Sequence, residues 1–441
     1  MNARESAFLS LQKYENSGVY SNIELSYAIE RGNLEGSEKS LYTALFYGVI
    51  ERKLTLDYYI SLLSDRKDID MNIRIILRLG LYQLLYMNKI PESAAVNESV
   101  KLATRFYARK NSGNYVNAVL RTFLRKKNVL TLPDENKEPF RRLSVEYSVP
   151  EWICRLWTNA YGKEKTVRIL KTVNNHPSLT LTVNTLKTMP AALSEALNLA
   201  GIKAEISPVS KYSILLDGAV PMSRLEPLEG QFFVQDEASA LCVAAMDAKP
   251  GETVLDACAC PGGKSFGMAM SMQNKGAIRS LDLHKNKLSL IETGARKLGI
   301  SIIETGVQNA SVHNPDMPVF DKILCDVPCS GLGVIAKKPD IRYKSEEDIT
   351  RLPVLQAKIL ETNAAYLKEG GTLVYSTCTL NPAENREIVE EFLKNHPEFS
   401  LCPFRAGIAV CDGMLEILPY EYGTDGFFIS KLYKKKAANQ S

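Results

Sequence analysis

Long hydrophobic runs are missing from this sequence. No stretch approaches the roughly 18 consecutive apolar residues that a membrane-spanning helix needs. The first residues already carry charge, at Arg4 and Glu5, and no apolar core of a signal peptide follows them. We therefore predict a cytoplasmic protein that has no membrane partner.

Paired metal ligands are scarce as well. The chain has nine cysteines, but none of them belongs to a Cys-x-x-Cys array, and only four histidines are present. The sequence therefore predicts no metal site. In the cytoplasm the cysteines are expected to be reduced thiols rather than partners in disulfides.

Acidic residues are absent from one stretch of the chain, although the formal net charge of the whole is only +4. Residues 101–127 contain no Asp or Glu, and they carry Lys101, Arg105, Arg109, Lys110, Arg121, Arg125, Lys126 and Lys127. Such a run either attracts a polyanion or forms a solvated helix face, and charge alone leaves both readings open.

The chain of 441 residues is too long for one ordinary domain. Apolar residues recur at helical spacing in residues 42–50, 73–84 and 116–124, which predicts an all-helical bundle over residues 1–130. Residues 131–150 mix Pro, Asp, Glu and Asn without periodicity, so a linker is expected there.

Residues 151–229 are predicted to form a small α/β unit. A helical start over 150–173 is followed by a strand at 179–183, a helix at 191–199, and short strands at 203–206 and 212–216. A small sheet of this kind can bind RNA, but the stretch has no aromatic ribonucleoprotein motif.

From residue 230 to residue 441 the pattern changes to alternating strands and helices. Strands are expected at 253–256, 278–283, 302–304, 322–326 and 372–375, with helices at 266–272 and 285–298. This alternation predicts a doubly wound, mostly parallel, Rossmann-like sheet. Ligands of such sheets bind beyond the carboxyl ends of the strands.

A glycine-rich loop follows the first predicted strand of this region, with the residues Cys258, Ala259, Cys260, Pro261, Gly262, Gly263 and Lys264. Its glycines let backbone amides approach a ligand at the start of a helix. The spacing is neither that of dinucleotide binders nor that of a P-loop, because the upstream glycine is missing. Asp282 ends the second strand, where a carboxylate can accept hydrogen bonds from both ribose hydroxyls.

Two cysteines follow later strands of the same region. Cys329 comes soon after the strand that ends at Asp326, and Cys378 comes after residues 372–375. Either cysteine alone would be read as a buried, inert thiol. Their placement at the same edge of one sheet instead predicts a pair of reacting groups.

Several motifs resemble those of RNA cytosine-5 methyltransferases: CACPGGK (258–264), DVPCSGLGV (326–334), KKPDIRYK (337–344), YSTCTLNPAEN (375–385) and QDEAS (235–239). IPESAAVNESVKLA (90–103) and YVNAVLR (115–121) resemble the NusB antitermination factor. Together they are similar to bacterial 16S ribosomal RNA cytosine-5 methyltransferases of the Sun/Fmu type. The resemblance covers essentially the whole chain and is least distinct across residues 130–225.

This resemblance implies an S-adenosylmethionine-dependent enzyme with an RNA-binding, NusB-like domain in front. The residues 258–264, Asp282, Asn309 and Asp326 would line the S-adenosylmethionine pocket. The family usually has Asp where this chain has Asn309, although Asn keeps an acceptor oxygen. Cys260 stands where a small apolar residue is commoner and is expected to be a packing residue.

The resemblance also assigns catalytic roles. Cys378 would add to carbon 6 of cytosine, which makes carbon 5 able to attack a methyl group, and Cys329 would help to resolve the adduct. Asp326 would hold the proton at cytosine N3, and Lys264 would help to hold the thiolate. DNA cytosine-5 enzymes use the cysteine of a Pro-Cys motif, here Cys329, and the sequence alone leaves that exchange of roles open.

The expected partner is 16S ribosomal RNA before the subunit is fully assembled, and the expected oligomeric state is a monomer. Two alternatives remain at this point. The chain would act on transfer RNA or on another ribosomal position, or it would be a non-catalytic RNA-binding factor of the NusB type. Intact cysteine motifs speak against the second.

Overall fold

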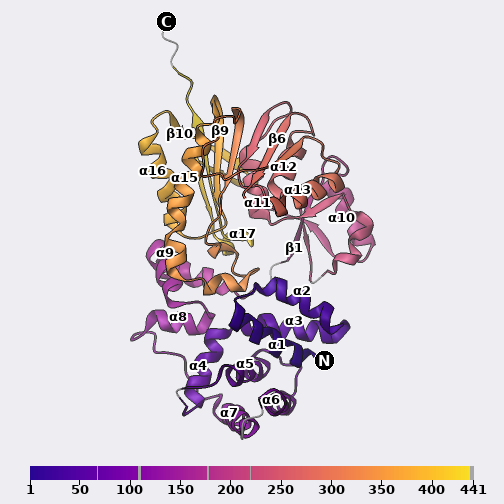
Figure 1. Ribbon diagram of the computed structural model, residues 1–441, viewed down its shortest axis with the longest axis vertical. Helices are drawn as coiled ribbons and strands as arrows, with labels where there is room; N and C mark the ends of the chain where they lie inside the picture. Colours follow the sequence, from indigo (N-terminus) through magenta and orange to yellow (C-terminus); the bar gives the residue numbers. More distant parts are fainter. Residues whose placement is uncertain (67, 108–110, 176–177, 219, 438–441) are drawn as a thin grey trace. The chain divides into compact units, whose positions relative to one another are not determined.

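A computed structural model describes residues 1–66, 68–107, 111–175, 178–218 and 220–437 (Figure 1). The chain divides into two compact units. The first contains Met1–Asn174 together with Lys338–Tyr343, and the second contains the remainder. Among the described residues, no helix combines the length and the apolar character that crossing a bilayer requires.

The first unit is helical, as the periodicity of its apolar residues predicts. Its helices are α1 (Ala3–Ser17), α2 (Ser21–Gly32), α3 (Gly36–Glu51), α4 (Lys53–Leu63), α5 (Met71–Tyr86), α6 (Glu92–Phe106), α7 (Ser112–Lys126), α8 (Pro139–Tyr147) and α9 (Glu151–Thr172). The apolar stripe of α7 is buried through Val116, Val119 and Leu120, which join one core with the stripes of α3 and α5.

The stretch predicted as a linker, residues 131–150, differs from that expectation because it contains α8. This helix starts on Pro139, and the first helical position tolerates proline. The Thr55 hydroxyl of α4 donates to the carbonyl of Val145 at 2.5 Å, so α8 is tied to the bundle. By its contacts, the following helix α9 lies in the same compact unit as the bundle.

A short segment from far along the chain completes the helical unit. Pro339–Tyr343 forms a 3-10 helix, η4, and its Arg342 side chain is fully buried. The guanidinium donates to four oxygens: the carbonyls of Glu51 (2.7 Å), Ser148 (3.0 Å) and Val173 (3.1 Å), and the side-chain oxygen of Asn174 (3.1 Å). Arg342 thus satisfies carbonyls of three separate segments.

The second unit begins with a four-stranded antiparallel sheet in the order β2-β3-β1-β4. Its elements are β1 (Leu179–Val183), α10 (Pro190–Leu199), β2 (Ala204–Ile206), β3 (Ser213–Leu216), η1 (Met222–Arg224), η2 (Glu226–Leu228) and β4 (Phe232–Val234). Leu181, Leu193 and Ile214 lie in its core. We did not predict β4, which is only three residues long.

The larger sheet has the order β10-β14-β9-β8-β5-β6-β7, with β13 beside β14. Its strands are β5 (Thr253–Asp256), β6 (Ala277–Asp282), β7 (Ile303–Val307), β8 (Phe320–Asp326), β9 (Leu367–Thr377), β10 (Phe399–Leu401), β13 (Met414–Ile417) and β14 (Phe427–Lys434). β5 to β9 pair in parallel and overlap the predicted strands. β14 runs antiparallel to β9, and the sequence analysis did not predict this pairing.

Helices cover both faces of this sheet (Figure 1). Val254 and Leu324 point toward α11 (Glu237–Met246), α12 (Gly263–Ser271) and α13 (Lys285–Leu298). The alternate residues Leu255 and Ile323 point toward α15 (Leu352–Ala364) and α16 (Arg386–Asn395). The remaining elements are η3 (Leu332–Val334), α14 (Glu346–Thr350), η5 (Pro382–Glu384), β11 (Phe404–Ala406), β12 (Ala409–Cys411) and α17 (Pro419–Tyr422). This is the predicted doubly wound architecture.

Candidate active site

The glycine-rich loop joins β5 to α12 at the carboxyl edge of the large sheet. It is pinned there because the Ala257 amide donates to the Leu324 carbonyl (2.9 Å) and the Ala259 amide to the Leu281 carbonyl (2.8 Å). Gly262 has a φ of 111°, and a Cβ atom at this position would lie 2.6 Å from the Phe266 ring. A residue with a side chain therefore does not fit at Gly262.

A buried carboxyl group lies directly below the loop. Asp256, the last residue of β5, accepts a hydrogen bond from the Ser265 hydroxyl at 2.7 Å through one oxygen. Its other oxygen is buried and has no hydrogen-bond partner among the described residues. Burial raises the pKa of Asp256 to about 7, against the opposing effect of the Ser265 hydrogen bond. The base of the loop therefore retains an acceptor for a polar ligand group or water.

Asp282 lies beside the same loop at the end of β6. One oxygen accepts from the His284 amide at 2.9 Å, and the other accepts from the Cys260 amide at 3.3 Å. Burial, followed by the Asp282 charge, raises the pKa of the Cys260 thiol to about 12. Cys260 is therefore a poor nucleophile, in keeping with the packing role that we expected.

Asn309 follows β7 and uses its side-chain oxygen within its own turn. This oxygen accepts from the Ser311 amide at 3.1 Å and from the Ser311 hydroxyl at 2.8 Å. An Asp side chain would offer the same acceptor, so the turn itself does not distinguish the two residues.

Asp326, at the end of β8, forms an ion pair with the lysine that closes the glycine-rich loop. The Lys264 ammonium lies 2.6 Å from one carboxylate oxygen, and the Ser376 hydroxyl donates to the other at 2.8 Å. Burial alone would lower the pKa of Lys264, but attraction by the Asp326 carboxylate outweighs it, and the pKa lies above its usual value. Lys264 therefore carries its charge inside the site.

The two cysteines that we singled out meet at this edge. The sulfur atoms of Cys329 and Cys378 are 3.3 Å apart. A hydrogen bond from Cys329 lowers the pKa of the Cys378 thiol below its usual value, aided by Lys264 and opposed by burial. The same hydrogen bond, with burial, raises the pKa of Cys329. The two pKa shifts run in opposite directions, and a lowered thiol pKa favours Cys378 as the thiolate of the pair.

Sequence reasoning did not single out a second charged group, although two of its three residues, Asp236 and Lys337, belong to motifs already quoted. Lys337 forms ion pairs with Asp236 and with Asp425, the latter at 2.9 Å. Burial, followed by the Asp236 charge, raises the pKa of Asp425 to about 7. Asp425 comes just before β14, and the next residue, Gly426, donates its amide to the carbonyl of Gly333.

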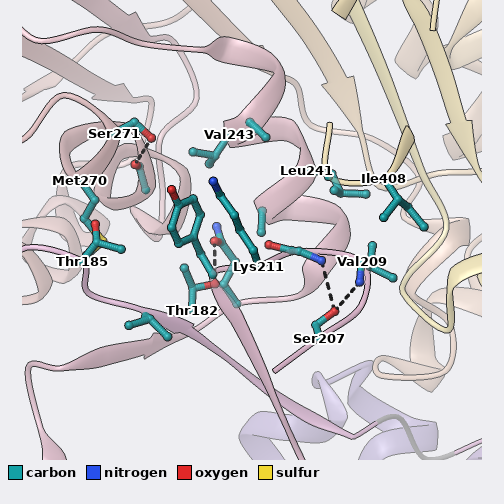
Figure 2. A pocket seen from close by; sticks show the side chains of 18 of the residues that line it. Thr182, Thr185, Ser207, Val209, Lys211, Leu241, Val243, Met270, Ser271 and Ile408 are labelled. Carbon is teal, nitrogen blue, oxygen red and sulfur yellow. Dashed lines mark hydrogen bonds between the residues drawn. The ribbon is translucent and has the colours of Figure 1, made fainter. Parts of the chain in front are cut away.

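A separate hollow of about 830 Å³ lies between the small sheet and α11 and α12 (Figure 2). Val209, Leu241, Val243 and Met270 give it apolar walls, and the Lys211 side chain extends into it (Figure 2). The residues 258–264, Cys329 and Cys378 are not among its lining residues. The reacting thiols therefore belong to another part of the unit.

The basic run is exposed on α6 and α7 where the structure describes it. Three members pair with acids from other stretches: Lys101 with Glu98, Arg105 with Glu5, and Lys127 with Glu92. Arg121 and Arg125 instead donate to the neutral side chains of Asn117 and Thr122. Arg109 and Lys110 lie outside the described residues.

All nine cysteines are free thiols. Across the described part of the chain, no three His, Cys, Asp or Glu side chains gather in a way that could hold a metal ion. The site therefore consists of the loop, the carboxylates at the ends of β5, β6 and β8, and the thiol pair.

Three family models match successive parts of this chain. The family described as 16S rRNA methyltransferase RsmB/F matches residues 243–433, the NusB family matches residues 1–125, and the RsmF/B-like ferredoxin-like domain matches residues 149–223. The probable ribosomal RNA small subunit methyltransferase B of Bacillus subtilis (strain 168) is 39% identical over 98% of both chains. Its Synechocystis counterpart is 35% identical over 98% of this chain and 100% of its own.

A solved structure agrees with these relatives. The crystal structure of PH0851 superposes with a TM-score of 0.80 and 26% identity, and it covers 98% of each chain. Both the helical part and the methyltransferase part of this chain therefore have counterparts in one known fold. The chain belongs to the 16S rRNA methyltransferase RsmB/F family, and it is an S-adenosylmethionine-dependent RNA methyltransferase.

Proposed function

We propose that this protein methylates carbon 5 of a cytosine in 16S ribosomal RNA, with Cys378 as the nucleophile. The observation that carries the proposal is the pair of thiols 3.3 Å apart, in which the pKa of Cys378 is lowered and the pKa of Cys329 is raised. Carbon 5 of cytosine is a poor nucleophile, and adding a thiolate to carbon 6 makes it enamine-like. A pair in which one cysteine is the thiolate and the other its proton-bearing neighbour suits this chemistry.

The residues at the carboxyl edge suit S-adenosylmethionine. The residues 258–264, Asp282, Asn309 and Asp326 would hold it, because they combine a tight loop with polar side chains that follow the ends of neighbouring parallel strands. When bound, S-adenosylmethionine supplies an electrophilic methyl group on a sulfonium.

Side chains of the protein would carry out the remaining steps of the reaction. The Cys378 thiolate forms a bond to carbon 6, and Asp326, held by Lys264 and Ser376, is placed to hold the proton at N3. Once carbon 5 carries its methyl group, the proton on that carbon must leave as the bond from Cys378 to carbon 6 breaks. Cys329 adjoins Cys378 and would assist that step.

The substrate assignment draws on the relatives, which are named for the small ribosomal subunit. The target base must leave any stacked helix to reach Cys378, which favours RNA that is not yet enclosed in a finished subunit. The protein would work on it in the cytoplasm as a monomer. Phosphate contacts from the helical unit and the small sheet would position the RNA without specifying its sequence.

Bisulfite sequencing tests the proposal directly. Unmodified 16S ribosomal RNA, transfer RNA and 23S ribosomal RNA are incubated with the protein and S-adenosylmethionine, and each cytosine is read. One protected cytosine in 16S RNA is the expected result. Protection confined to transfer RNA or 23S RNA would replace the substrate assignment, and no protection in any of them would contradict the reaction.

Replacing Asp282 by alanine should weaken S-adenosylmethionine binding by about 1–3 kcal/mol, because hydrogen bonds to a charged acceptor are lost. Asp282→Asn keeps one oxygen for the Cys260 amide and should lose less. Isothermal calorimetry measures both, with Asp316→Ala as an exposed aspartate control. Unchanged affinity in Asp282→Ala removes this carboxylate from the pocket.

Reversing Arg121, Arg125 and Lys126 to glutamate should weaken RNA binding and flatten its salt dependence, since each lost phosphate contact lowers the slope. These three side chains are exposed on α7. Filter binding at several salt concentrations measures both quantities. The matched control reverses the exposed Lys163, Lys165 and Lys171 of α9. An identical slope in the two triple variants would mean that the run is only a solvated face.

A further inference from the structure

Glu384 is a fully buried carboxyl group beside the thiol pair. Its oxygens accept three hydrogen bonds, from the Ser330 amide (2.8 Å), the Gln356 side chain (2.9 Å) and the Asn381 side chain (2.9 Å). All three donors are uncharged N–H groups, and both oxygens act as acceptors. Both oxygens of Glu384 are therefore held in place as acceptors.

Two of the three donors come from the loops that carry the cysteines. Ser330 directly follows Cys329, and Asn381 lies three residues after Cys378. Gln356, on α15, also donates to the Pro328 carbonyl at 2.9 Å, on the other side of Cys329. Glu384 therefore links the Cys329 loop to the Cys378 loop, and the hydroxyls of Ser330 and Thr379 add a second link at 2.6 Å.

Asn385, the residue that follows Glu384, holds the chain on both sides of Cys378. The side-chain oxygen of Asn385 accepts from the Thr377 hydroxyl at 2.5 Å, and its amide nitrogen donates to the Thr379 carbonyl at 3.0 Å. The amide of Gly333 donates to the Cys378 carbonyl at 3.0 Å. With this loop fixed, the spacing of the two sulfurs depends on the links from it to the Cys329 loop, through Glu384 and through the Ser330 and Thr379 hydroxyls.

The charge of Glu384 acts unequally on the two thiols. It raises the pKa of Cys329, after the larger effects of the Cys378 hydrogen bond and of burial. The other charged groups that face the pair are Lys264, Asp326 and Asp425, and these act on Cys378. A negative charge on the Cys329 side disfavours a thiolate there and leaves the thiolate to Cys378.

We infer that Glu384 is a positioning residue for methyl transfer: it sets the spacing of the two thiols and keeps their shared proton on Cys329. This inference rests on the proposed role of Cys378 as the nucleophile. Glu384 itself acts through the two cysteines and has no contact with the reacting base in this argument.

The test is Glu384→Gln, which keeps the size of the side chain and removes its charge. Iodoacetamide is applied to the full chain over a range of pH, and mass spectrometry of the two peptides gives the rate at each cysteine. We expect the ratio of Cys329 to Cys378 alkylation to rise about tenfold, the change that one pKa unit produces. The methylation rate should fall while S-adenosylmethionine affinity stays the same.

Two further variants keep the test decisive. Glu387→Gln makes the same charge change three residues later, at an exposed position of α16, and should change neither ratio nor rate. Gln356→Met removes one donor to Glu384 and should shift the ratio in the same direction by a smaller factor. It replaces Glu384→Gln if that variant does not fold.

An unchanged alkylation ratio in a folded Glu384→Gln variant overturns the inference, whether or not methylation falls, because a merely structural residue would leave the proton where it was. Failure of the proposed function gives a different pattern. In that case the ratio still shifts, but no RNA adduct forms at Cys378 in the unaltered protein.

Discussion

Cys378→Ser is expected to lose methylation by on the order of 10³-fold or more, and to form no covalent complex with RNA. A serine hydroxyl has no thiolate form to add to carbon 6 at neutral pH. Cys329→Ser should still add through Cys378 and transfer the methyl group, but it should fail to release the product. It is therefore expected to accumulate a protein–RNA complex that resists denaturant.

A denaturing gel with labelled RNA distinguishes the two outcomes, because the complex migrates slowly. The double variant should show no complex, and Cys402→Ser, at a half-buried thiol outside the site, should behave like the unaltered protein. A trapped complex in Cys378→Ser and none in Cys329→Ser would reverse the two roles and support the DNA-type assignment.

Arg342→Leu is expected to destabilise the helical unit by about 3–5 kcal/mol, since several buried acceptors lose their donor at once. Leucine fills part of the space but leaves the carbonyls of Glu51, Ser148 and Val173 without their partner. Each buried carbonyl that loses this donor carries its own desolvation penalty, which makes the substitution costly.

Hydrogen exchange measured peptide by peptide across residues 1–174 in increasing urea is the suitable readout, because a chain with two units has no single unfolding transition. Arg125→Leu, an exposed arginine of the same unit, is the control and should cost less than about 0.5 kcal/mol. Equal protection in the two variants would show that water replaces the guanidinium without loss.

Local patterns predicted most of the architecture. Helical spacing of apolar residues located α3, α5 and α7, and short apolar runs located β5 to β9. These elements could be predicted because the residues that each one buries recur at a regular spacing within the element itself. α8 was missed because residues 131–150 show no clear helical periodicity, and β4 because three residues carry little periodicity of their own. The antiparallel edge at β14 depends on pairing with β9, a partner about 50 residues away that no local pattern reveals.

For the site as well, local motifs predicted some features, whereas others depend on contacts between distant parts of the chain. The loop and the two cysteines could be predicted from motifs, as could the neighbourhood of Lys264 and Asp326. The direction of the proton between the thiols could not, because it depends on the hydrogen bond between two sulfurs and on the buried charge of Glu384. Arg342 was quoted within a methyltransferase motif, yet its partners are carbonyls of the helical unit, which backbone atoms of any sequence could provide.

That placement of Arg342 has a consequence for synthesis. The ribosome makes a chain from its amino end, so all the helices of the first unit emerge long before residues 338–343 do. Until then the carbonyls at Glu51, Ser148 and Val173 lack the hydrogen bonds that the Arg342 guanidinium donates, and the unit is incomplete. Nearly four fifths of the protein must be translated before its first unit can close, and a fragment that stops at residue 174 never acquires the side chain that closes it.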